Sequence, residues 1–384
     1  MDTYFAVTAP GLESFTAREL TDLGLLTVPA PEESSQAGVP FKGDLPALYR
    51  ANLHLRTASR ILARVGAFFY ATTYPELQKR TSRLPWERFL SPGQPILLRV
   101  TCRQSKLYNS EAVARTVSVG LEERLGKASP LVKADEETDG HPPQMIVVRL
   151  VDDKCSLSVD TSGALLHKRG YRLAVAKAPL RETLAAALLM ASGWDASAPL
   201  LDPFCGSGTI PIEAALMRLG LSPGLNRRFA FMDWPGYDQA AFSDQRSVVG
   251  NLQSIILNQQ SSIAILASDR DAGAILMAHE NAARAGVEAA IEFKCQAVSS
   301  ITPPPGPGWV VTNPPYGLRS SQGGDLRNLY AQFGNVLRRQ CPGWSVAVLC
   351  NDPVLLGQMH MELDTSLGFV NGGIGVRLAR GMVT

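Results

Sequence analysis

The residues best suited to chemistry are Asn313, Pro314, Pro315 and Tyr316, which follow an apolar run at residues 309–312. Neither proline has a backbone N–H to donate to a neighbouring strand, so a strand formed by the apolar run must end there. The segment therefore brings an amide side chain, a stiff carbonyl and an aromatic ring to one strand end. Such a set can hold a planar base that carries an NH2 group. The alternative is that these four residues form an ordinary turn.

A second candidate site lies upstream, where residues 200–209 read Leu-Leu-Asp-Pro-Phe-Cys-Gly-Ser-Gly-Thr. An apolar strand that ends in an acid is followed by a glycine-rich turn and a helix, and glycines let the backbone approach a ligand closely. The pattern is neither a Walker motif nor the full dinucleotide fingerprint. The acid can pair with a cationic amine, such as the methionine ammonium of S-adenosylmethionine (SAM). The residues expected to contact SAM here are Asp202, Pro203, Phe204, Cys205, Gly206, Ser207 and Gly208.

The next strand is expected to end at Asp269, which Arg270 and Asp271 follow. An acid at the tip of the second strand is placed to accept hydrogen bonds from the hydroxyls of a cofactor ribose. We assign this role to Asp269 and place Arg270 beside the cofactor. Asp271 is expected to cap the following helix, and Asn281 on that helix is expected to be structural.

These residues need a sheet whose strand ends meet at one edge. Short apolar runs at residues 199–202, 263–268, 309–312 and 345–350 are separated by helical or loop segments. This alternation predicts an α/β domain with a mostly parallel sheet that is covered on both faces.

The end of the chain has a different pattern, because residues 367–378 contain two apolar runs joined by Asn371-Gly372-Gly373. Asn-Gly between apolar runs is a strong signal for an antiparallel hairpin. A parallel sheet that ends in such a hairpin is the Rossmann-like architecture of class I SAM methyltransferases. If the strands before Asp202 and Asn313 flank the point where strand order reverses, the SAM methyl group faces Asn313.

The N-terminal half is organised differently. Residues 3–8 are expected to form a strand, residues 12–23 a helix and residues 26–28 a second strand, which suggests a small ferredoxin-like α+β unit. Residues 42–133 contain 16 Lys and Arg against 6 Asp and Glu, whereas the whole chain has a formal net charge of only +2. A basic module beside a neutral one suits a polyanion that one domain holds and the other modifies. The alternative is a solvated helical surface.

Two sets of basic residues are candidates for binding RNA phosphates. Arg103 and Lys106 follow a predicted strand inside the basic window. The second set lies between the two modules and either contacts phosphates or forms a solvated linker; it comprises His167, Lys168, Arg169 and Arg172. Trp86 and Trp234 are expected to have packing roles.

The six cysteines show neither C-x-x-C pairs nor the spacing of zinc ligands, so we expect free thiols in a reducing compartment and no metal site. Cys205 is a candidate nucleophile, but no His is placed to activate it, which favours packing or cofactor contact. The first residues lack the features of a signal peptide, and no uncharged apolar run reaches membrane-spanning length. These features predict a cytoplasmic protein with no membrane partner.

At these motifs the sequence resembles the THUMP-domain RNA guanine-N2 methyltransferases, and the resemblance extends over nearly the whole chain. The stretches that carry it are residues 103–108, 159–163, 166–172, 178–182, 202–209 and 313–317. A further stretch, Ser-Pro-Gly-Leu-Asn-Arg-Arg-Phe-Ala-Phe at residues 222–231 with Trp234 after it, is similar to the RlmL/YpsC-like subgroup. That subgroup methylates guanine N2 in bacterial 23S ribosomal RNA, and the related tRNA enzymes look less similar at this insertion.

The resemblance implies a domain order along the chain. It implies a ferredoxin-like domain at residues 1–65, a THUMP RNA-binding domain at 66–165, a linker at 166–178 and a Rossmann-like methyltransferase domain at 179–384. It also implies an acid after the third strand that contacts the adenine amino group of SAM. This chain departs from that pattern, because residues 293–298 read Phe-Lys-Cys-Gln-Ala-Val. The amide oxygen of Gln296, or a backbone carbonyl, is expected to accept that bond instead.

The residues and the resemblance together predict SAM-dependent methylation of a guanine N2 amine in 23S ribosomal RNA. The side-chain oxygen of Asn313 and the carbonyl of Pro314 would accept the two N–H bonds of the amine, and Tyr316 would stack on the flipped base. Three alternatives remain: a tRNA guanine-N2 methyltransferase, methylation of an adenine amine, and a THUMP RNA-binding protein with weak or lost activity.

Overall fold

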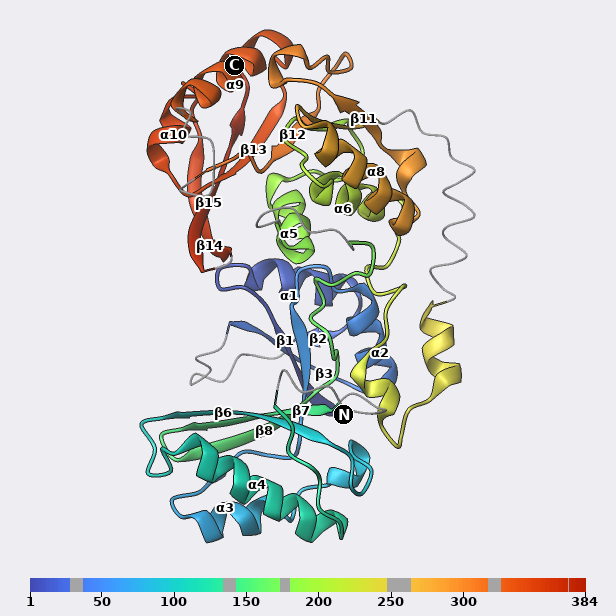
Figure 1. The fold of residues 1–384 in the computed structure, drawn as a ribbon, viewed down its shortest axis with the longest axis vertical. Helices are drawn as coiled ribbons and strands as arrows, with labels where there is room; N and C mark the ends of the chain where they lie inside the picture. The colour runs from blue at the N-terminus through green and yellow to red at the C-terminus, as the bar shows by residue number, and fades with distance from the viewer. Residues whose placement is uncertain (28–36, 134–142, 173–179, 247–263, 317–325, 372) are drawn as a thin grey trace.

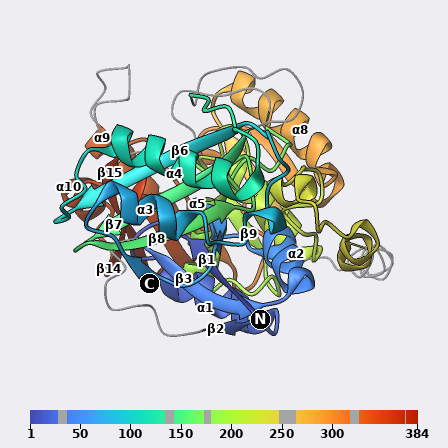
Figure 2. The ribbon, with the colours of Figure 1, turned by 90° about the horizontal axis from the view of Figure 1, so that it is seen from below.

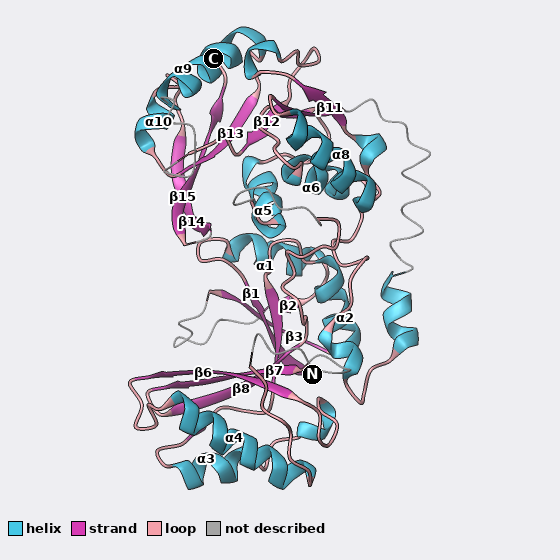
Figure 3. Cartoon of the chain, viewed as in Figure 1, coloured by secondary structure: helices cyan, strands magenta, loops and turns pink. Residues whose placement is uncertain are grey.

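The structure is a computed structural model of the 384-residue chain. It describes residues 1–27, 37–133, 143–172, 180–246, 264–316, 326–371 and 373–384. The described residues form two sheets, one of eight strands in the N-terminal half and one of seven in the C-terminal half. Figure 1 shows the two sheets in opposite halves of an elongated molecule, and Figure 3 shows the helices that accompany each.

The first part of the N-terminal sheet is ferredoxin-like, as predicted. Its elements are β1 (Asp2–Val7), α1 (Glu13–Asp22), β2 (Leu26–Thr27), β3 (Gly38–Gly43), α2 (Leu45–His54) and β4 (Arg60–Arg64). The strands lie in the order β2-β3-β1-β4, and β1 is antiparallel to both β3 and β4. Strand β3 is not predicted from the sequence, because two glycines and Pro40 give it little strand character.

The second part extends the same sheet. Its elements are β5 (Phe69–Tyr70), α3 (Tyr74–Thr81), β6 (Ile96–Arg103), α4 (Ser110–Leu125), β7 (Gln144–Val151) and β8 (Lys154–Asp160), with a 3-10 turn at Trp86–Arg88. Strand β8 pairs with β4, which gives one continuous order β2-β3-β1-β4-β8-β7-β6. Figure 2 views the molecule from this end and shows α3 and α4 lying across the strands.

The C-terminal sheet has the order β11-β10-β9-β12-β13-β15-β14. Its strands are β9 (Leu200–Asp202), β10 (Ile265–Asp269), β11 (Glu292–Cys295), β12 (Trp309–Thr312), β13 (Ser345–Cys350), β14 (Asp364–Asn371) and β15 (Ile374–Met382). Strands β9, β10, β11, β12 and β13 are each parallel to their neighbours among these five, whereas β15 is antiparallel to β13 and β14. This arrangement confirms the predicted fold class, a mostly parallel sheet that ends in an antiparallel hairpin.

Helices cover both faces of this sheet, because its strands are apolar on each side. They are α5 (Glu182–Ser192), α6 (Thr209–Arg218), α8 (Ala272–Ala285), α9 (Leu326–Gln340) and α10 (Pro353–Gly357), with 3-10 turns at Ala230–Asp233, Glu288–Ala290 and Val298–Ser300. Val311 belongs to the core shared with α5 and α6, whereas its neighbour Val310 belongs to the core shared with α9 and α10. The sheet is therefore buried on both sides and leaves its strand ends for ligands.

A segment of the C-terminal half packs into the core of the N-terminal half. We call its four buried aromatic residues, Phe229, Phe231, Trp234 and Phe242, the aromatic brace. Phe229 and Phe231 stack with ring centroids 5.2 Å apart, and Tyr49 of α2 lies 4.7 Å from Phe231. The brace therefore holds the two halves together through apolar burial.

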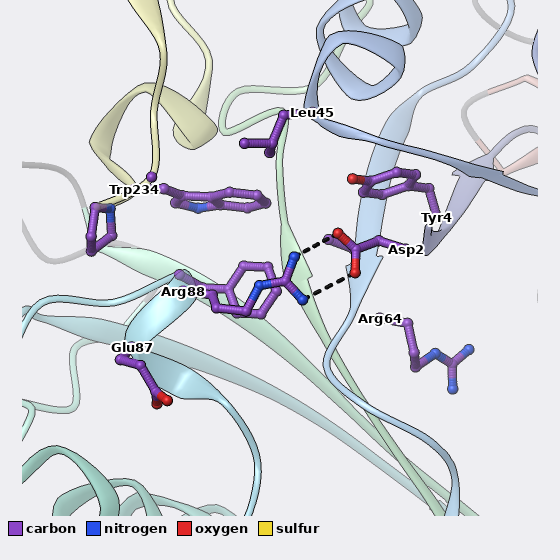
Figure 4. Close-up of a pocket in the computed structure, with 11 residues that line it drawn as sticks. Asp2, Tyr4, Leu45, Arg64, Glu87, Arg88 and Trp234 are labelled. Atoms are coloured by element: carbon purple, nitrogen blue, oxygen red, sulfur yellow. Dashed lines mark hydrogen bonds and ion pairs between the residues drawn. The ribbon is translucent and has the colours of Figure 1, made fainter.

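The brace borders a cavity of about 260 Å³ next to the N-terminal sheet. Figure 4 shows the Trp234 indole and Leu45 on one side of it and Arg88 on the other. The Arg88 guanidinium donates to both carboxylate oxygens of Asp2, at 3.0 and 2.6 Å. Trp86 and Trp234 are 0% and 5% exposed, which confirms the packing role predicted for both residues.

Candidate active site

The topology brings the predicted chemical residues to one edge of the C-terminal sheet. Strand β9 pairs with β10 on one side and with β12 on the other, so strand order reverses at β9. Asp202 ends β9, Asp269 ends β10 and Asn313 directly follows β12. Ligands of open α/β sheets bind at the carboxyl ends of strands where the order reverses. The expectation that the Asp202 and Asn313 strands flank this point is confirmed.

Asp202 is a buried carboxyl group at the centre of this edge, with 1% of its surface exposed. The hydroxyl of Thr312 donates to its Oδ1 atom at 2.6 Å, and the backbone N–H of Phe204 donates to the same atom at 3.2 Å. Burial raises the pKa of Asp202 to about 7, and the nearby Asp269 contributes to the rise. A carboxylate kept from water in this way is stabilised by a cationic partner, which is what a SAM ammonium would supply.

The glycine-rich turn after β9 is held from several directions. Gly206 and Gly208 have φ angles of +52° and +84°, which glycine adopts without strain. A side chain on Gly208 would also meet Ala278 of α8 at 3.0 Å. The Asn281 amide donates to the carbonyl of Ser207 at 3.0 Å, so Asn281 has the structural role expected of it. Cys205 is 7% exposed, in agreement with packing.

Asp269 links this turn to the neighbouring strand ends. Its two carboxylate oxygens accept the backbone N–H groups of Gly206 and Asp271, both at 3.0 Å. The backbone N–H of Gln296 donates to the Asp269 carbonyl at 2.9 Å, which places Gln296 beside the second strand end. Arg270 is exposed at the same edge. Asp271 caps α8 through Gly273 and Ala274, as expected.

The acceptor side of the edge is formed by the segment after β12. Asn313 is half-buried, and its Oδ1 atom is shielded from solvent and has no hydrogen-bond partner among the described residues. Pro314 is buried, and Tyr316 is half-buried against both cores of the domain. Gly317 of the same motif lies outside the described residues. A buried amide oxygen without a donor is costly, so this atom is available to a ligand N–H.

A second amide group, which the sequence does not single out, lies one strand further along. Asn351 follows β13, the parallel neighbour of β12, and its Oδ1 atom is likewise buried without a partner in the described part of the chain. Side chains alternate across a sheet, so Asn313 and Asn351 continue the face that carries Val311 and Leu349. Two unpaired amide oxygens therefore occupy adjacent strand ends on the same face.

The structure places two of the predicted RNA contacts, Arg169 and Arg172, in ion pairs inside the fold. Arg169 is 4% exposed, and its guanidinium donates to the carbonyls of Leu166 and Arg56 at 2.6 and 2.7 Å. Its Nε atom lies 3.4 Å from the carboxylate of Glu213. A guanidinium enclosed in this way joins the two halves of the molecule and is not presented to phosphate.

Arg172 has a similar structural role. It lies 3.5 Å from the Glu182 carboxylate and donates to the carbonyl of Leu180 at 2.9 Å. His167 is half-buried, and burial, reinforced by Arg181, lowers its pKa to about 4, so it is neutral near pH 7. Neither residue is an available cation. Lys168 is exposed, as are Arg103 and Lys106, and their RNA contacts remain predictions. Residues 173–178 of the predicted linker lie outside the described residues.

Functional residues that the sequence does not reveal act through long-range contacts. Thr312 fixes Asp202 across two strands, and nothing in its local sequence distinguishes it from an ordinary strand threonine. Asn351 is a single amide after an apolar run, which is a weak signal. Within the described residues no cluster of His, Cys, Asp and Glu is arranged to hold a metal ion, and no helix is long and apolar enough to cross a membrane. All six cysteines are free.

Family models match three successive parts of the chain. An RlmL ferredoxin-like domain matches residues 3–62, a THUMP domain matches residues 71–160 and an RMKL-like methyltransferase domain matches residues 169–380. A Synechocystis relative named "Putative RNA methyltransferase" is 34% identical over 378 residues, which cover 97% of this chain and 94% of that protein. A Vibrio campbellii relative named "Ribosomal RNA large subunit methyltransferase K/L" is 34% identical over 380 residues, which cover 97% of this chain and 52% of that protein.

The chain thus spans about half the length of this second relative. Among solved structures, a "putative methyltransferase complexed with SAH" superimposes with a TM-score of 0.83 at 29% identity, over 99% of this chain and 97% of that one. SAH, S-adenosylhomocysteine, is what SAM becomes once its methyl group has left. The buried Asp202 and the close glycine turn fit the same cofactor. The chain therefore belongs to the RlmK/L-type family of RNA methyltransferases and has their SAM-binding fold.

Proposed function

We propose that this chain transfers the methyl group of SAM to the N2 amine of a guanine in 23S ribosomal RNA. The observation that carries the proposal is the buried Oδ1 atom of Asn313, which has no partner among the described residues and lies where strand order reverses. An amine N–H would satisfy this oxygen. The guanine, and the ribosomal source of the RNA, are supported by the resemblance to guanine-N2 enzymes and by the name of the Vibrio relative.

The acceptor amine needs activation, because its lone pair is delocalised into the base. The Asn313 Oδ1 atom and the Pro314 carbonyl accept its two N–H bonds, which favours a pyramidal nitrogen with its lone pair directed away from both. SAM supplies an electrophilic methyl group on a sulfonium and leaves as a neutral thioether. The N2 proton is lost to water as the amine is alkylated, so the site needs no strong base. Positioning and electrostatics therefore supply most of the catalysis.

The cofactor residues divide between the two ends of SAM. Asp202 pairs with the methionine ammonium, and the turn from Pro203 to Gly208 lies against the ligand. Asp269 would accept hydrogen bonds from the ribose, Arg270 would lie beside it and the Gln296 amide would face the adenine. The hydrogen bond between Gly206 and Asp269 supports this division, because it fixes the turn and the ribose acid to one another.

The RNA side of the site combines a flipped base with a basic module. Tyr316 stacks on the base, which must leave its RNA helix to reach the strand end. Arg103 and Lys106 in the N-terminal half and Lys168 near the joint are exposed cations that can contact phosphates.

The test is the identity of the methylated nucleoside. The purified chain is incubated with labelled SAM and 23S ribosomal RNA, and the RNA is digested and separated. We expect label in N2-methylguanosine, and a rate of labelling about 10²- to 10³-fold lower when Asn313→Ala is used. Label in an adenine nucleoside, or label only when tRNA replaces ribosomal RNA, would replace the proposed substrate. Absence of SAM binding in calorimetry would show an RNA-binding protein without activity.

A further inference from the structure

The N-terminal sheet has two faces with different residues along strands β4, β8, β7 and β6. Side chains alternate across a strand, so every second residue points to the same face. Ile61, Val148 and Leu157 point to the face on which α2, α3 and α4 pack, and they are almost completely buried. The residues between them point to the other face.

That other face is lined by cations. They are Arg60 and Arg64 on β4, Arg99 and Arg103 on β6, Arg149 on β7 and Lys154 on β8, and we call these six residues the basic face. The strand registers place them together: Arg149 pairs with Thr101, between Arg99 and Arg103, and Lys154 pairs with Val151. Among the described residues of these four strands, Asp160 is the acid on this face, and it forms an ion pair with Arg60.

The positive charges of the basic face act on one another. Burial, together with the charge of Arg149, lowers the pKa of Arg64 to about 10. Burial also lowers the pKa of Arg149, with a second contribution from Arg103. For Arg60, burial lowers the pKa against the opposing effect of Asp160, and Arg99 adds to the lowering. Cations that repel one another across a surface are stabilised by an anion that lies over several of them.

One guanidinium nitrogen of the basic face lacks an acceptor among the described residues. The Nη1 atom of Arg64 is buried and has no hydrogen-bond partner among the described residues. Its guanidinium carbon lies 4.2 Å from the ring centroid of Phe68, and the Lys154 ammonium lies 4.9 Å from the same ring. Tyr70 pairs with Lys154 at this edge and is 61% exposed. The edge therefore combines an unsatisfied donor, two cations and an exposed aromatic ring.

We propose that the basic face is the surface on which the RNA substrate docks as an unpaired strand. Guanidinium groups bind phosphate oxygens through paired N–H donors, which suits the arginines of this face. Aromatic rings beside cations are the arrangement that binds unpaired bases, so Tyr70 is placed to stack on one. This inference rests on the proposed function, because RNA is the polyanion that a methyltransferase of this family must hold.

Charge reversal on the two sides of the same sheet tests the proposal. One variant of the full chain carries Arg99→Glu, Arg103→Glu and Arg149→Glu. Its control carries Lys79→Glu, Arg80→Glu and Arg115→Glu on α3 and α4, which makes the same change in charge on the helical side. Binding of a labelled single-stranded ribosomal RNA oligonucleotide is measured over a range of salt concentrations. The slope of log K against log salt is negative, and each phosphate contact to a single strand that is lost makes it shallower by about 0.7, so the slope of the basic-face variant should be shallower by about 2.

The control should keep the wild-type slope. The opposite result, a shallower slope for the control alone, would place RNA on the helices and overturn the proposal. Unchanged RNA binding in both variants would also overturn the proposal, and it would point to an acidic protein as the partner of the basic face. SAM binding checks the fold of each variant, and the single change Arg103→Glu replaces the triple one if the latter does not fold. Failure of the proposed function is distinguishable, because the wild type would then bind the oligonucleotide without methylating 23S RNA.

A second variant separates base stacking from charge. Tyr70→Ala should weaken binding of the unpaired oligonucleotide by about 5- to 150-fold, the range that one stacked base contributes. The salt slope should stay at the wild-type value, because no phosphate contact is lost. Equal affinity of Tyr70→Ala and wild type for the single strand would show that no base stacks there and would contradict docking of an unpaired strand.

Discussion

The two sheets of the molecule position their polar residues in opposite ways. The C-terminal sheet gathers a few of them at its strand ends, where Asp202, Asp269 and Asn313 meet beside the glycine-rich turn. The N-terminal sheet spreads cations over one face of its strands β4, β6, β7 and β8. Methyl transfer needs reacting groups at one point in fixed geometry, whereas holding a polyanion needs charge repeated over an area. Desolvation is common to both, because burial raises the pKa of the Asp202 carboxyl and lowers that of the Arg64 guanidinium.

The largest expected effect concerns the aromatic brace, which packs a segment of the C-terminal half into the core of the N-terminal half. Phe231→Ala removes a fully buried ring of the aromatic brace and should lower the free energy of unfolding by about 3–5 kcal/mol. The matched control, Phe68→Ala, removes a ring that is 42% exposed and should cost about 1 kcal/mol or less. Denaturant unfolding of both variants checks this. Equal losses would show that the brace does not join the two halves.

The next prediction concerns Asp202, the carboxyl group for which we propose a contact with the SAM ammonium. Asp202→Asn keeps the shape of the side chain but removes its charge, so SAM binding should weaken by about 10- to 150-fold, the range for hydrogen bonds to charged groups. Calorimetric titration with SAM measures the change. Asp195→Asn, an exposed acid that caps a local turn, is the control and should leave SAM affinity unchanged. Wild-type affinity in Asp202→Asn would remove Asp202 from the site.

The same carboxyl group predicts a pH dependence. Its pKa of about 7 means that the unliganded site is mostly protonated in mildly acidic solution, and the ammonium of SAM favours the ionised form. As the pH increases toward 7, SAM affinity should therefore rise about tenfold per pH unit, and above pH 7 it should level off. Without ligand the sign is reversed: the folded state retains a proton that the unfolded state has lost, so Asp202 makes stability fall as pH rises from about 4 to about 7.

Titrations with SAM across this pH range in wild type and in Asp202→Asn would test the assignment. The variant should show a flat profile across this range, because it lacks the carboxyl group whose ionisation the SAM ammonium favours. A wild-type slope that persists in the variant would assign the titration to another group.

The smallest expected effect concerns Asn351, whose Oδ1 atom is the second buried amide oxygen without a partner in the described residues at this edge of the C-terminal sheet. If the Oδ1 atom of Asn351 accepts a hydrogen bond from the acceptor base, Asn351→Ala should lower kcat/KM for RNA by about 2- to 12-fold while SAM affinity stays constant. Asn328→Ala on the exposed side of α9 is the control and should leave kcat/KM unchanged. A similar loss in both variants would show that Asn351 does not contact the base.

Residues in continuous motifs could be predicted from the sequence, whereas residues whose roles depend on distant partners could not. Asp202 and Asn313 each end or directly follow a short apolar run that leads into a turn. The local sequence pattern alone therefore predicts that both lie at strand ends. Arg169 and Arg172 looked like free cations, because the carboxylates of Glu213 and Glu182 that enclose them are brought near only by the fold. The basic face was hidden for the same reason, since Arg64, Arg99 and Arg149 become neighbours only through strand register.

The central claim is that Asn313 holds the acceptor amine, and one paired measurement tests it most directly. SAM affinity and the single-turnover rate of methyl transfer to 23S ribosomal RNA are measured for the wild type and for Asn313→Ala. We predict unchanged SAM affinity and a rate that falls by about 10²- to 10³-fold, as when one preorganised polar group is removed from an active site. Transfer at the wild-type rate by Asn313→Ala would contradict the account.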